Sequence, residues 1–393
     1  MKKYLSVFFT LCFFCGVVQG SDDDYDRGNH EQQLGQKLYT DTNLSLHKNQ
    51  SCESCHRLSR VRLANGQRLA SPGFVDADNV ATGSFTSAGS VAGQFGGLNT
   101  PSAGYAAFSP EFHFDENEGL WIGGQFWNGR AATLEEQAKG PFLNPVEMAM
   151  PSRWAVVSVL RDDSDYVKMF NKVYDFDLRS IPSHVNADSD VDAPQAVVEA
   201  YNLIARAIAS FERSQVFNRF NSKFDFVMQG KAKFTAEEMA GKNLFEGKAQ
   251  CALCHVMDPV VAPDGKTYPP VFTDFTYDNI GVPRNTGIHG NPAPDIGLAA
   301  TTGNAEDLGK HKVMSLRNIA ITAPYGHNGY FASLEHIVHF YNTRDVVSEG
   351  WAAPEISDNV NTDELGNLGL TREEEQAIVA FLKTLTDGYD DDD

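Results

Sequence analysis

Three features are scarce in this 393-residue chain, and each absence excludes a class of protein. Basic residues are outnumbered, with 32 Lys and Arg against 52 Asp and Glu, which gives a formal net charge of −20. Nucleic-acid phosphates attract a basic face, so the sequence predicts no nucleic-acid partner. The longest apolar run, 5–18, is shorter than the roughly 20 residues of a membrane-spanning helix, so no membrane span is predicted.

Residues 1–20 have the pattern of a cleaved signal peptide. Lys2 and Lys3 form a basic start, the apolar run follows, and the small residues Gly20 and Ser21 suit cleavage. We therefore expect an exported protein, in the periplasm or at the cell surface. Cys15 also permits a lipoprotein, although Phe14 precedes it where a small residue is usual.

Cysteine is scarce too, and its placement is informative. Two of the six cysteines lie in the signal segment, and the other four form two C-x-x-C-H motifs, Cys52-Cys55-His56 and Cys251-Cys254-His255. This is the attachment signature of a c-type haem, in which both thiols bind the haem and the His binds its iron. A zinc or thiol-redox C-x-x-C is the alternative reading, but the repetition with a closing His favours two covalent haem c groups.

The remaining pattern predicts a mainly α fold with long loops and little strand. A short helix is expected over 134–139, stopped by Gly140-Pro141, and a long amphipathic helix from Pro194. Capping boxes at Thr235 and Thr371 predict two further helix starts. We expect two cytochrome c-like domains, each with one haem, and the following division: signal peptide 1–20, N-terminal domain 21–190, C-terminal domain 191–386 and acidic tail 387–393.

The sixth coordination position of each haem iron decides what the protein does. A protein side chain in that position makes the haem an electron carrier, whereas a vacant one lets a small molecule such as peroxide react. Two haems on one chain suggest one site for chemistry and one for electron relay. From spacing alone, a two-haem electron carrier accounts for the motifs equally well.

Two longer stretches resemble the bacterial di-haem cytochrome c peroxidases and the related MauG enzymes, and the resemblance covers roughly residues 30–385. The first is Gln125-Phe126-Trp127-Asn128-Gly129-Arg130-Ala131 with Leu134, Gln137, Gly140-Pro141, Asn144-Pro145 and Glu147-Met148 after it. The second is Ser315-Leu316-Arg317-Asn318 followed by Thr322-Ala323-Pro324-Tyr325-Gly326-His327-Asn328-Gly329.

The resemblance implies roles for single residues. The haem on His56 would react with peroxide, Glu147 would act as acid and base in breaking the O–O bond, and Gln137 would orient the peroxide. Trp127 would conduct electrons between the haems. The residues matching the family's calcium site, whose oxygen atoms suit that hard cation, are Asn99, Thr322 and Pro324.

Two positions separate the branches of the family. The peroxidases carry a distal His in the loop after the first motif, but no His lies between His56 and His113, and Pro72 stands at the matching position. His113 lies beyond this loop. For the second haem, Tyr341 stands where the peroxidases have Met and MauG has Tyr. Packing on a helix face is its other reading, and the competing ligands are Met257, Met314 and His311.

The resemblance favours a hydrogen peroxide-dependent enzyme of MauG type. It would store two oxidising equivalents over both haems and oxidise a Trp or Tyr of a partner protein by long-range electron transfer. The alternative is a cytochrome c peroxidase that makes water with electrons from a small cytochrome c or cupredoxin. A third hypothesis is a non-catalytic di-haem electron carrier.

Overall fold

The computed structural model describes residues 22–60, 69, 71–182, 189–262, 265–288 and 293–390, so the predicted signal peptide lies outside the described residues. The described chain is mainly helical, as predicted. Its α-helices are α1 Asp22–Thr40, α2 Cys52–Cys55, α3 Ala77–Thr82, α4 Leu134–Leu143, α5 Arg153–Asp162, α6 Ser164–Tyr174, α7 Gln195–Glu212, α8 Lys223–Met228, α9 Ala236–Glu246, α10 Ala299–Thr302, α11 Leu334–Thr343 and α12 Arg372–Lys383.

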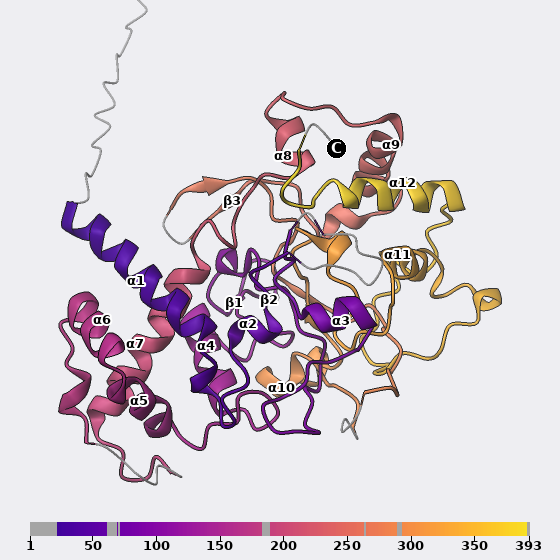
Figure 1. Ribbon diagram of the computed structural model, residues 1–393. Helices are drawn as coiled ribbons and strands as arrows, with labels where there is room; N and C mark the ends of the chain where they lie inside the picture. The colour runs from indigo at the N-terminus through magenta and orange to yellow at the C-terminus, as the bar shows by residue number, and fades with distance from the viewer. Residues whose placement is uncertain are drawn as a thin grey trace, which may run out of the picture.

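Strand structure in the described residues is limited to three antiparallel pairs. Strand β1 (His113–Asp115) pairs with β2 (Leu120–Ile122), β3 (Val260–Val261) with β4 (Thr267–Tyr268), and β5 (Tyr277–Asp278) with β6 (His311–Lys312). Figure 1 shows two helix groups on opposite sides, α1 and α5–α7 on one and α8, α9 and α12 on the other, with long loops between them.

The first core forms where α1 crosses α7. A Cβ atom at Gly35 of α1 would overlap the carbonyl oxygen of Ala207, so only glycine lets the two backbones approach this closely. Leu34, Leu38 and Ile208 are buried beside the crossing. This contact holds the helix that leads to the first haem motif.

The second core repeats the same contact between α9 and α12. A Cβ atom at Gly241 would overlap the carbonyl oxygen of Ala377, and Phe245 and Phe381 pack there edge to face with their ring centroids 5.3 Å apart. Helix α9 leads to the second haem motif as α1 leads to the first. The capping boxes predicted at Thr235 and Thr371 open α9 and α12, as expected.

The repetition extends to the helices that carry the candidate distal residues. Helix α11 begins and ends 200 residues after α4, at Leu334 and Thr343 against Leu134 and Leu143. A single β-bridge precedes each helix, Gln125 with Ala131 and Tyr325 with Phe331. The two units are therefore built on one plan.

Helix α4 is longer than predicted, because it continues past Gly140 and Pro141 to Leu143. The carbonyls of Pro141 and Phe142 accept hydrogen bonds from the backbone N–H groups of Met148 and Met150, at 3.2 and 2.7 Å. The following turn thus satisfies the end of the helix, and a proline in its last turns is tolerated.

The contacts of α7 and of Asp387 bear on two of the predicted domain limits. Helix α7 contributes its apolar face to the first core, so a division after Phe217 fits the contacts better than one at residue 190; the division itself stays a prediction. The predicted acidic tail is wrong at its start. Asp387 is fully buried because its carboxylate accepts hydrogen bonds from Tyr105 and Asn318.

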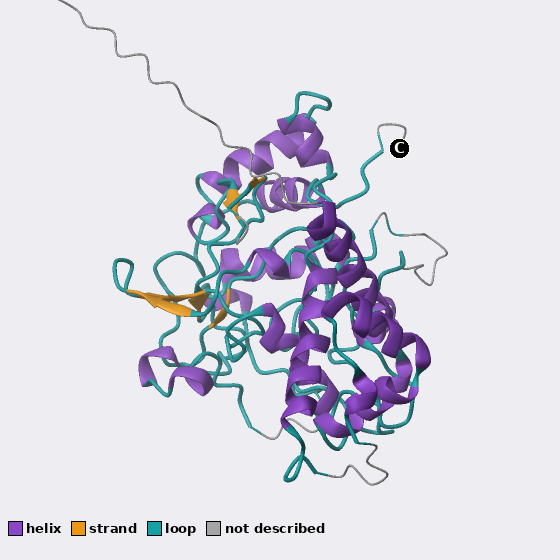
Figure 2. Ribbon diagram, turned by 90° about the vertical axis from the view of Figure 1, so that its left-hand side faces the viewer, coloured by secondary structure: helices purple, strands orange, loops and turns teal. Residues whose placement is uncertain are grey.

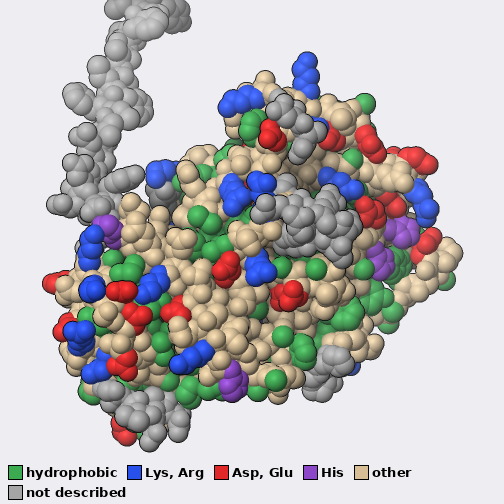
Figure 3. Space-filling model, in the orientation of Figure 1, with side chains coloured by type: hydrophobic (Ala, Val, Ile, Leu, Met, Phe, Trp, Pro, Cys, Tyr) green, Lys and Arg blue, Asp and Glu red, His purple; other side chains and the backbone are tan. Residues whose placement is uncertain are grey.

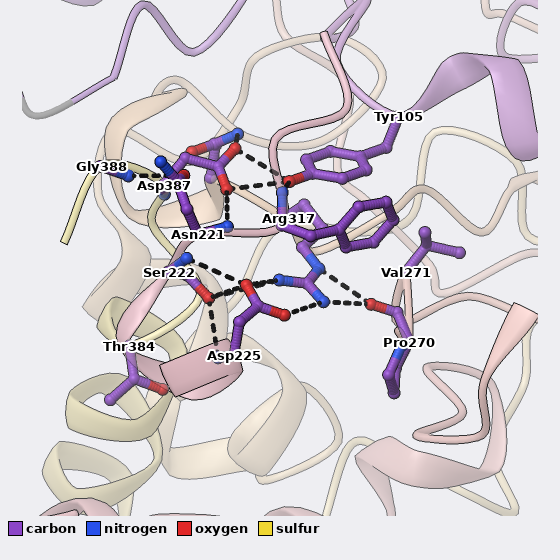
Figure 4. Close-up of polar contacts among 12 residues, drawn as sticks. Tyr105, Asn221, Ser222, Asp225, Pro270, Val271, Arg317, Thr384, Asp387 and Gly388 are labelled. Carbon is purple, nitrogen blue, oxygen red and sulfur yellow. Dashed lines mark hydrogen bonds and ion pairs between the residues drawn. The ribbon is translucent and has the colours of Figure 1, made fainter. Parts of the chain in front are cut away.

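A buried ion pair joins Arg317 to Asp225, which lie far apart in the chain (Figure 4). The Arg317 guanidinium donates to both carboxylate oxygens of Asp225, at 2.6 and 3.0 Å, and to the Pro270 carbonyl. Both charged side chains are almost completely buried, at 0% and 1% exposed. Arg317 also donates from Nε to the Pro270 carbonyl and from Nη1 to the Ser222 hydroxyl, so its N–H groups are hydrogen-bonded. A buried charge is tolerated when it is paired and hydrogen-bonded in this way.

Charge is more mixed on the surface than the net value suggests. On the face shown in Figure 3, acidic side chains gather near the α9–α12 pair, with lysine and arginine side chains among them. Lys248 and Glu374, for example, form an ion pair of 2.6 Å between these elements.

We predict that Arg317→Met lowers the free energy of unfolding by roughly 3–5 kcal/mol, because it leaves the Asp225 carboxylate buried without its partner. Denaturant unfolding of the haem-loaded protein measures the change. Lys168→Met is the matched control, since Lys168 and Asp165 form an exposed pair, at 76% and 69%, worth at most about 1 kcal/mol. Equal losses in the two variants would contradict the structural role of the buried pair.

Candidate functional site

The two motif histidines are oriented in the same way. The Nδ1 atom of His56 lies 3.3 Å from the Phe74 carbonyl oxygen, and that of His255 lies 2.9 Å from the Phe272 carbonyl oxygen. Both phenylalanines adopt a left-handed backbone, with φ of 55° and 57°, which is unusual for a non-glycine residue. Nδ1–H donates to the carbonyl in this arrangement, so the lone pair of Nε2 is free for a metal.

Both motifs line one cavity of about 530 Å³. Cys52, Cys55, Cys251 and Cys254 are free thiols, and desolvation lowers the pKa of both histidines, which favours the neutral imidazole that binds iron. Paired thiols beside an Nε2 that faces an apolar cavity fit a covalently held haem at each motif.

The predicted distal residues of the first motif lie together on and after α4. Gln137 and Glu147 both line the cavity, and Asn144 donates a hydrogen bond of 2.7 Å to the Glu147 carboxylate. Burial raises the pKa of Glu147, while the charge of Arg130 opposes the rise. A carboxyl with a raised pKa beside a cavity is suited to take up and release a proton.

A second pocket, of about 500 Å³, lies on the other side of Glu147. Five residues line both this pocket and the haem cavity, and they form the boundary between them: Phe126, Arg130, Pro141, Asn144 and Glu147. Arg130 is an exposed residue and stacks on the Phe126 ring at 3.5 Å. Glu147 thus lines both the haem cavity and the second pocket.

Trp127 lies where the two halves of the chain meet. Its indole N–H donates to the Asn99 carbonyl at 2.8 Å, and its own carbonyl accepts from the backbone N–H of Lys312 at 2.8 Å. The side chain lines the cavity that both motifs share. This placement is compatible with the predicted role of Trp127 as an electron conduit between the haems.

The three predicted calcium ligands also line the cavity. The Asn99 amide nitrogen, however, donates to the Pro324 and Gly326 carbonyls, at 2.7 and 3.3 Å. A cation would need the amide oxygen in that place, so the amide would have to turn over. Calcium at Asn99, Thr322 and Pro324 stays a prediction.

Tyr341 lies on α11 and lines the cavity near the second motif. Burial raises its pKa, and the neighbouring Cys254 and Cys251 thiols raise it further. Its hydroxyl has no hydrogen-bond partner among the described residues. The hydroxyl is therefore available to a group that fills the cavity, and Tyr341 as the ligand of the second haem iron stays a prediction.

The competing ligands are placed differently. Both nitrogens of His311 are engaged, Nδ1 with the Gly309 carbonyl at 3.0 Å and Nε2 with Asp295 at 2.9 Å. Met257 packs against the second core, and Met314 lines the cavity with Tyr341. Met314 is therefore the main competitor.

At the first motif, the candidate for a distal histidine, His113, is not among the residues that line the cavity. His113 is exposed on β1, and its Nδ1 lies 2.8 Å from the Glu111 carbonyl oxygen. Pro72 cannot coordinate iron.

Sequence reasoning missed a buried polar group along the cavity. The rings of His311 and His327 stack 3.6 Å apart, with His327 hydrogen-bonded to Glu355 at 3.0 Å. Lys312 is buried, and burial lowers its pKa to about 7. Burial likewise raises the pKa of Glu212 to about 8, and its Oε2 lacks a partner among the described residues. No sequence spacing signals these contacts, which join residues far apart in the chain.

Two c-type haem attachment sites on a duplicated helical scaffold define a di-haem c-type haem protein. The chain belongs to the di-haem cytochrome c peroxidase family, whose model matches residues 29–233. It is therefore a haem peroxidase, an oxidoreductase with haem c cofactors.

Individual relatives indicate the MauG-like branch. The chain is 37% identical over 373 residues to the methylamine utilization protein MauG of Paracoccus denitrificans, an alignment that covers 90% of this chain and 88% of that protein. Among solved structures it is similar to a variant of the diheme peroxidase BthA from Burkholderia thailandensis, with a TM-score of 0.73 and 27% identity over 91% of this chain and 86% of the other. A MauG-like protein associated with microbial copper homeostasis matches with a TM-score of 0.64 and 29% identity, over 91% and 89%.

Across the described residues, no helix combines the length and apolarity needed to cross a bilayer.

We predict that Glu212→Gln flattens the dependence of stability on pH. The folded-state pKa of Glu212, about 8, lies above its ordinary value of 4.5, so the native protein holds this proton more tightly than the unfolded chain. Stability should therefore fall as pH rises from 4.5 to about 8, and less so in the variant. Unfolding of both proteins at several pH values checks this, and parallel curves would contradict it.

Proposed function

We propose that this protein is a MauG-type di-haem oxidoreductase, which uses hydrogen peroxide to oxidise a Trp or Tyr of a partner protein. The haems, when bound, reduce peroxide and store two oxidising equivalents. One peroxide, two protons and two electrons give two waters, and the partner residue supplies the two electrons. His56 and His255 would hold the two irons through Nε2.

Glu147 and Gln137 would handle the peroxide. The Glu147 carboxylate would take a proton from one peroxide oxygen and return it to the other, which leaves as water. Asn144 holds the carboxylate in place through its 2.7 Å hydrogen bond. Gln137 lines the same cavity and orients the peroxide by hydrogen bonding. The second pocket beside Glu147 offers a route for peroxide and protons.

Trp127 and Tyr341 would serve electron transfer and storage. Trp127 contacts both halves of the chain and serves as the conduit between the two haem sites. The Tyr341 phenolate would be the distal ligand at the second site, where a negative oxygen stabilises the oxidised metal and lowers its reduction potential.

The observation that carries this proposal is the unpaired Tyr341 hydroxyl in the cavity beside Cys251 and Cys254. A cytochrome c peroxidase that takes electrons from a small cytochrome c or cupredoxin is the second candidate, and Met314 in the same cavity is the observation in its favour. A non-catalytic carrier is disfavoured by the peroxidase family of the chain.

The two candidates are separated by the fate of the electrons. We expect a peroxide-dependent mass increase on a Trp or Tyr of a protein co-expressed with this chain. Fast peroxide turnover with a reduced small cytochrome c, without any such mass increase, would contradict the proposal and support the alternative.

Location, domains and calcium complete the proposal. The signal-like residues 1–20 support export to the periplasm. Each of two domains, predicted as 21–190 and 191–386, would hold one haem, and the packing of α7 in the first core supports a division after Phe217. A calcium ion at Asn99, Thr322 and Pro324 would fix the contact between the units once the Asn99 amide turns.

We predict that Glu147→Gln slows the reaction with peroxide by about 10²–10⁴-fold, because the amide cannot take up the proton. Stopped-flow absorbance at the haem bands measures the rate. Glu136→Gln is the control, since Glu136 lines the second pocket yet is paired with Lys139 and exposed. Similar rates for the two variants would exclude Glu147 as the acid and base.

We also predict that Tyr341→Phe changes the absorption and electron paramagnetic resonance (EPR) spectra of the second haem in the resting ferric protein, because the oxygen ligand is lost. Tyr330→Phe, on the segment before α11, should leave both spectra unchanged. If Met314→Leu changed the second haem and Tyr341→Phe did not, methionine would be the ligand.

A further inference from the structure

The β1–β2 hairpin places apolar side chains in solvent. Phe114 pairs with Trp121 and Asp115 with Leu120 across the hairpin, and Phe114 and Leu120 are 40% and 41% exposed. Figure 2 shows the hairpin reaching away from the body of the protein. Aromatic pairs stabilise hairpins, but this role does not require both Phe114 and Leu120 to face solvent.

The hairpin begins a continuous series of aromatic rings. Phe114 meets Trp121 edge to face with ring centroids 5.3 Å apart, and Trp121 stacks on Phe112 at 4.8 Å with an interplanar angle of 4°. Phe112 in turn meets Tyr277 edge to face at 6.0 Å. Tyr277 is on β5, so the series runs from the exposed tip into the protein.

The inner end of this series touches residues 126–130, the loop that the Gln125–Ala131 bridge closes and that carries Trp127 (the Trp127 loop). A Cβ at Gly129 would overlap both the Tyr277 hydroxyl and the Phe112 ring, and Gly129 has a φ of +71°. Tyr277 also pairs with Lys312, whose backbone N–H donates to the Trp127 carbonyl. Phe275, two residues before Tyr277, and Asp278, which follows Tyr277 on β5, line the haem cavity.

The carboxylates of the hairpin are not accompanied by Lys or Arg in the same segment. Asp115 ends β1, Glu116 and Glu118 lie in the turn, and no Lys or Arg occurs from residue 111 to residue 129. Glu116 and Glu118 are exposed. An acidic rim around an apolar and aromatic centre is complementary to a basic rim around an exposed aromatic residue.

We propose that the β1–β2 hairpin docks the partner protein and that Trp121 carries its electrons to the Trp127 loop. The partner is a protein with an oxidisable Trp or Tyr inside a basic surface patch. This inference rests on the proposed function and adds where the partner binds and which residue relays its electrons.

The oxidation of the partner residue and the reduction of peroxide balance in electrons without a further reagent. Trp121 gives one electron inward and receives one from the partner residue, twice for each peroxide, so Trp121 ends unchanged. The partner residue loses two electrons and the protons that its oxidation releases, and peroxide takes up two electrons and two protons to become two waters.

Trp121→Phe tests the relay, because phenylalanine keeps the stack on Phe112 but is much harder to oxidise than an indole. Trp351→Phe is the matched control, since Trp351 stacks on His336 away from the hairpin. The substrate probe is the peptide Lys-Lys-Trp-Lys-Lys, and the haem-loaded protein receives peroxide with or without it. Mass spectrometry reads oxidation of the peptide and, without it, of Trp121.

We expect Trp121→Phe to oxidise the peptide several-fold more slowly than either wild type or Trp351→Phe. The first equivalent of peroxide should react with the haem-loaded variant at an unchanged rate, because that reaction precedes electron transfer from the peptide. Trp121 should itself be oxidised when the peptide is absent. Equal peptide oxidation by Trp121→Phe and wild type would overturn the relay while leaving the proposed function intact. Peroxide consumption with no oxidation of peptide or Trp121 would overturn both.

Docking is tested without peroxide. Fluorescence anisotropy of the labelled peptide with the resting ferric protein should show binding that weakens with added salt and in the double variant E116Q/E118Q. A double variant in another acidic region, E373Q/E374Q on α12, should bind as wild type does. Equal weakening in the two double variants would mean a general effect of net charge and would overturn the docking surface.

Discussion

The hydrogen bond from each motif histidine to a backbone carbonyl is the constraint on which the rest of the structure depends. Phe74 and Phe272 adopt left-handed backbones that turn their carbonyls toward Nδ1 of His56 and His255. Each bond fixes the tautomer and points Nε2 into the shared cavity. The helix crossings at Gly35 and Gly241 hold these motifs at corresponding places in two similar units.

On the proposed function, different side chains on this repeated scaffold would give the two haem sites different chemistry. Gln137 on helix α4 and Glu147 in the turn after it line the cavity, and they would transfer protons to and from the peroxide. Helix α11, in the equivalent position, brings Tyr341 instead. In this proposal the oxidant would react at the polar, acid-containing site, the phenol would hold the second metal, and Trp127 would lie between them.

The sequence predicted much of this site, because short motifs carry their own chemistry. The haem motifs, the helix starts at Thr235 and Thr371 and the placement of Gln137 and Glu147 on one cavity follow from local or family patterns. Tertiary contacts decided the rest. The continuation of α4 through Pro141 depends on hydrogen bonds from Met148 and Met150, and the burial of Asp387 depends on Tyr105, 282 residues away. The aromatic series from Trp121 to Tyr277 likewise joins segments that no spacing relates.

The asymmetry between the two haems is tested most directly by EPR spectroscopy of the resting ferric protein, before and after one equivalent of hydrogen peroxide. The account predicts two different ferric signals, one from an iron with a vacant or water-filled sixth position and one from an iron closed by an oxygen ligand, both changing rapidly with peroxide. Two irons closed alike by protein ligands, with signals that peroxide leaves unchanged, would contradict it.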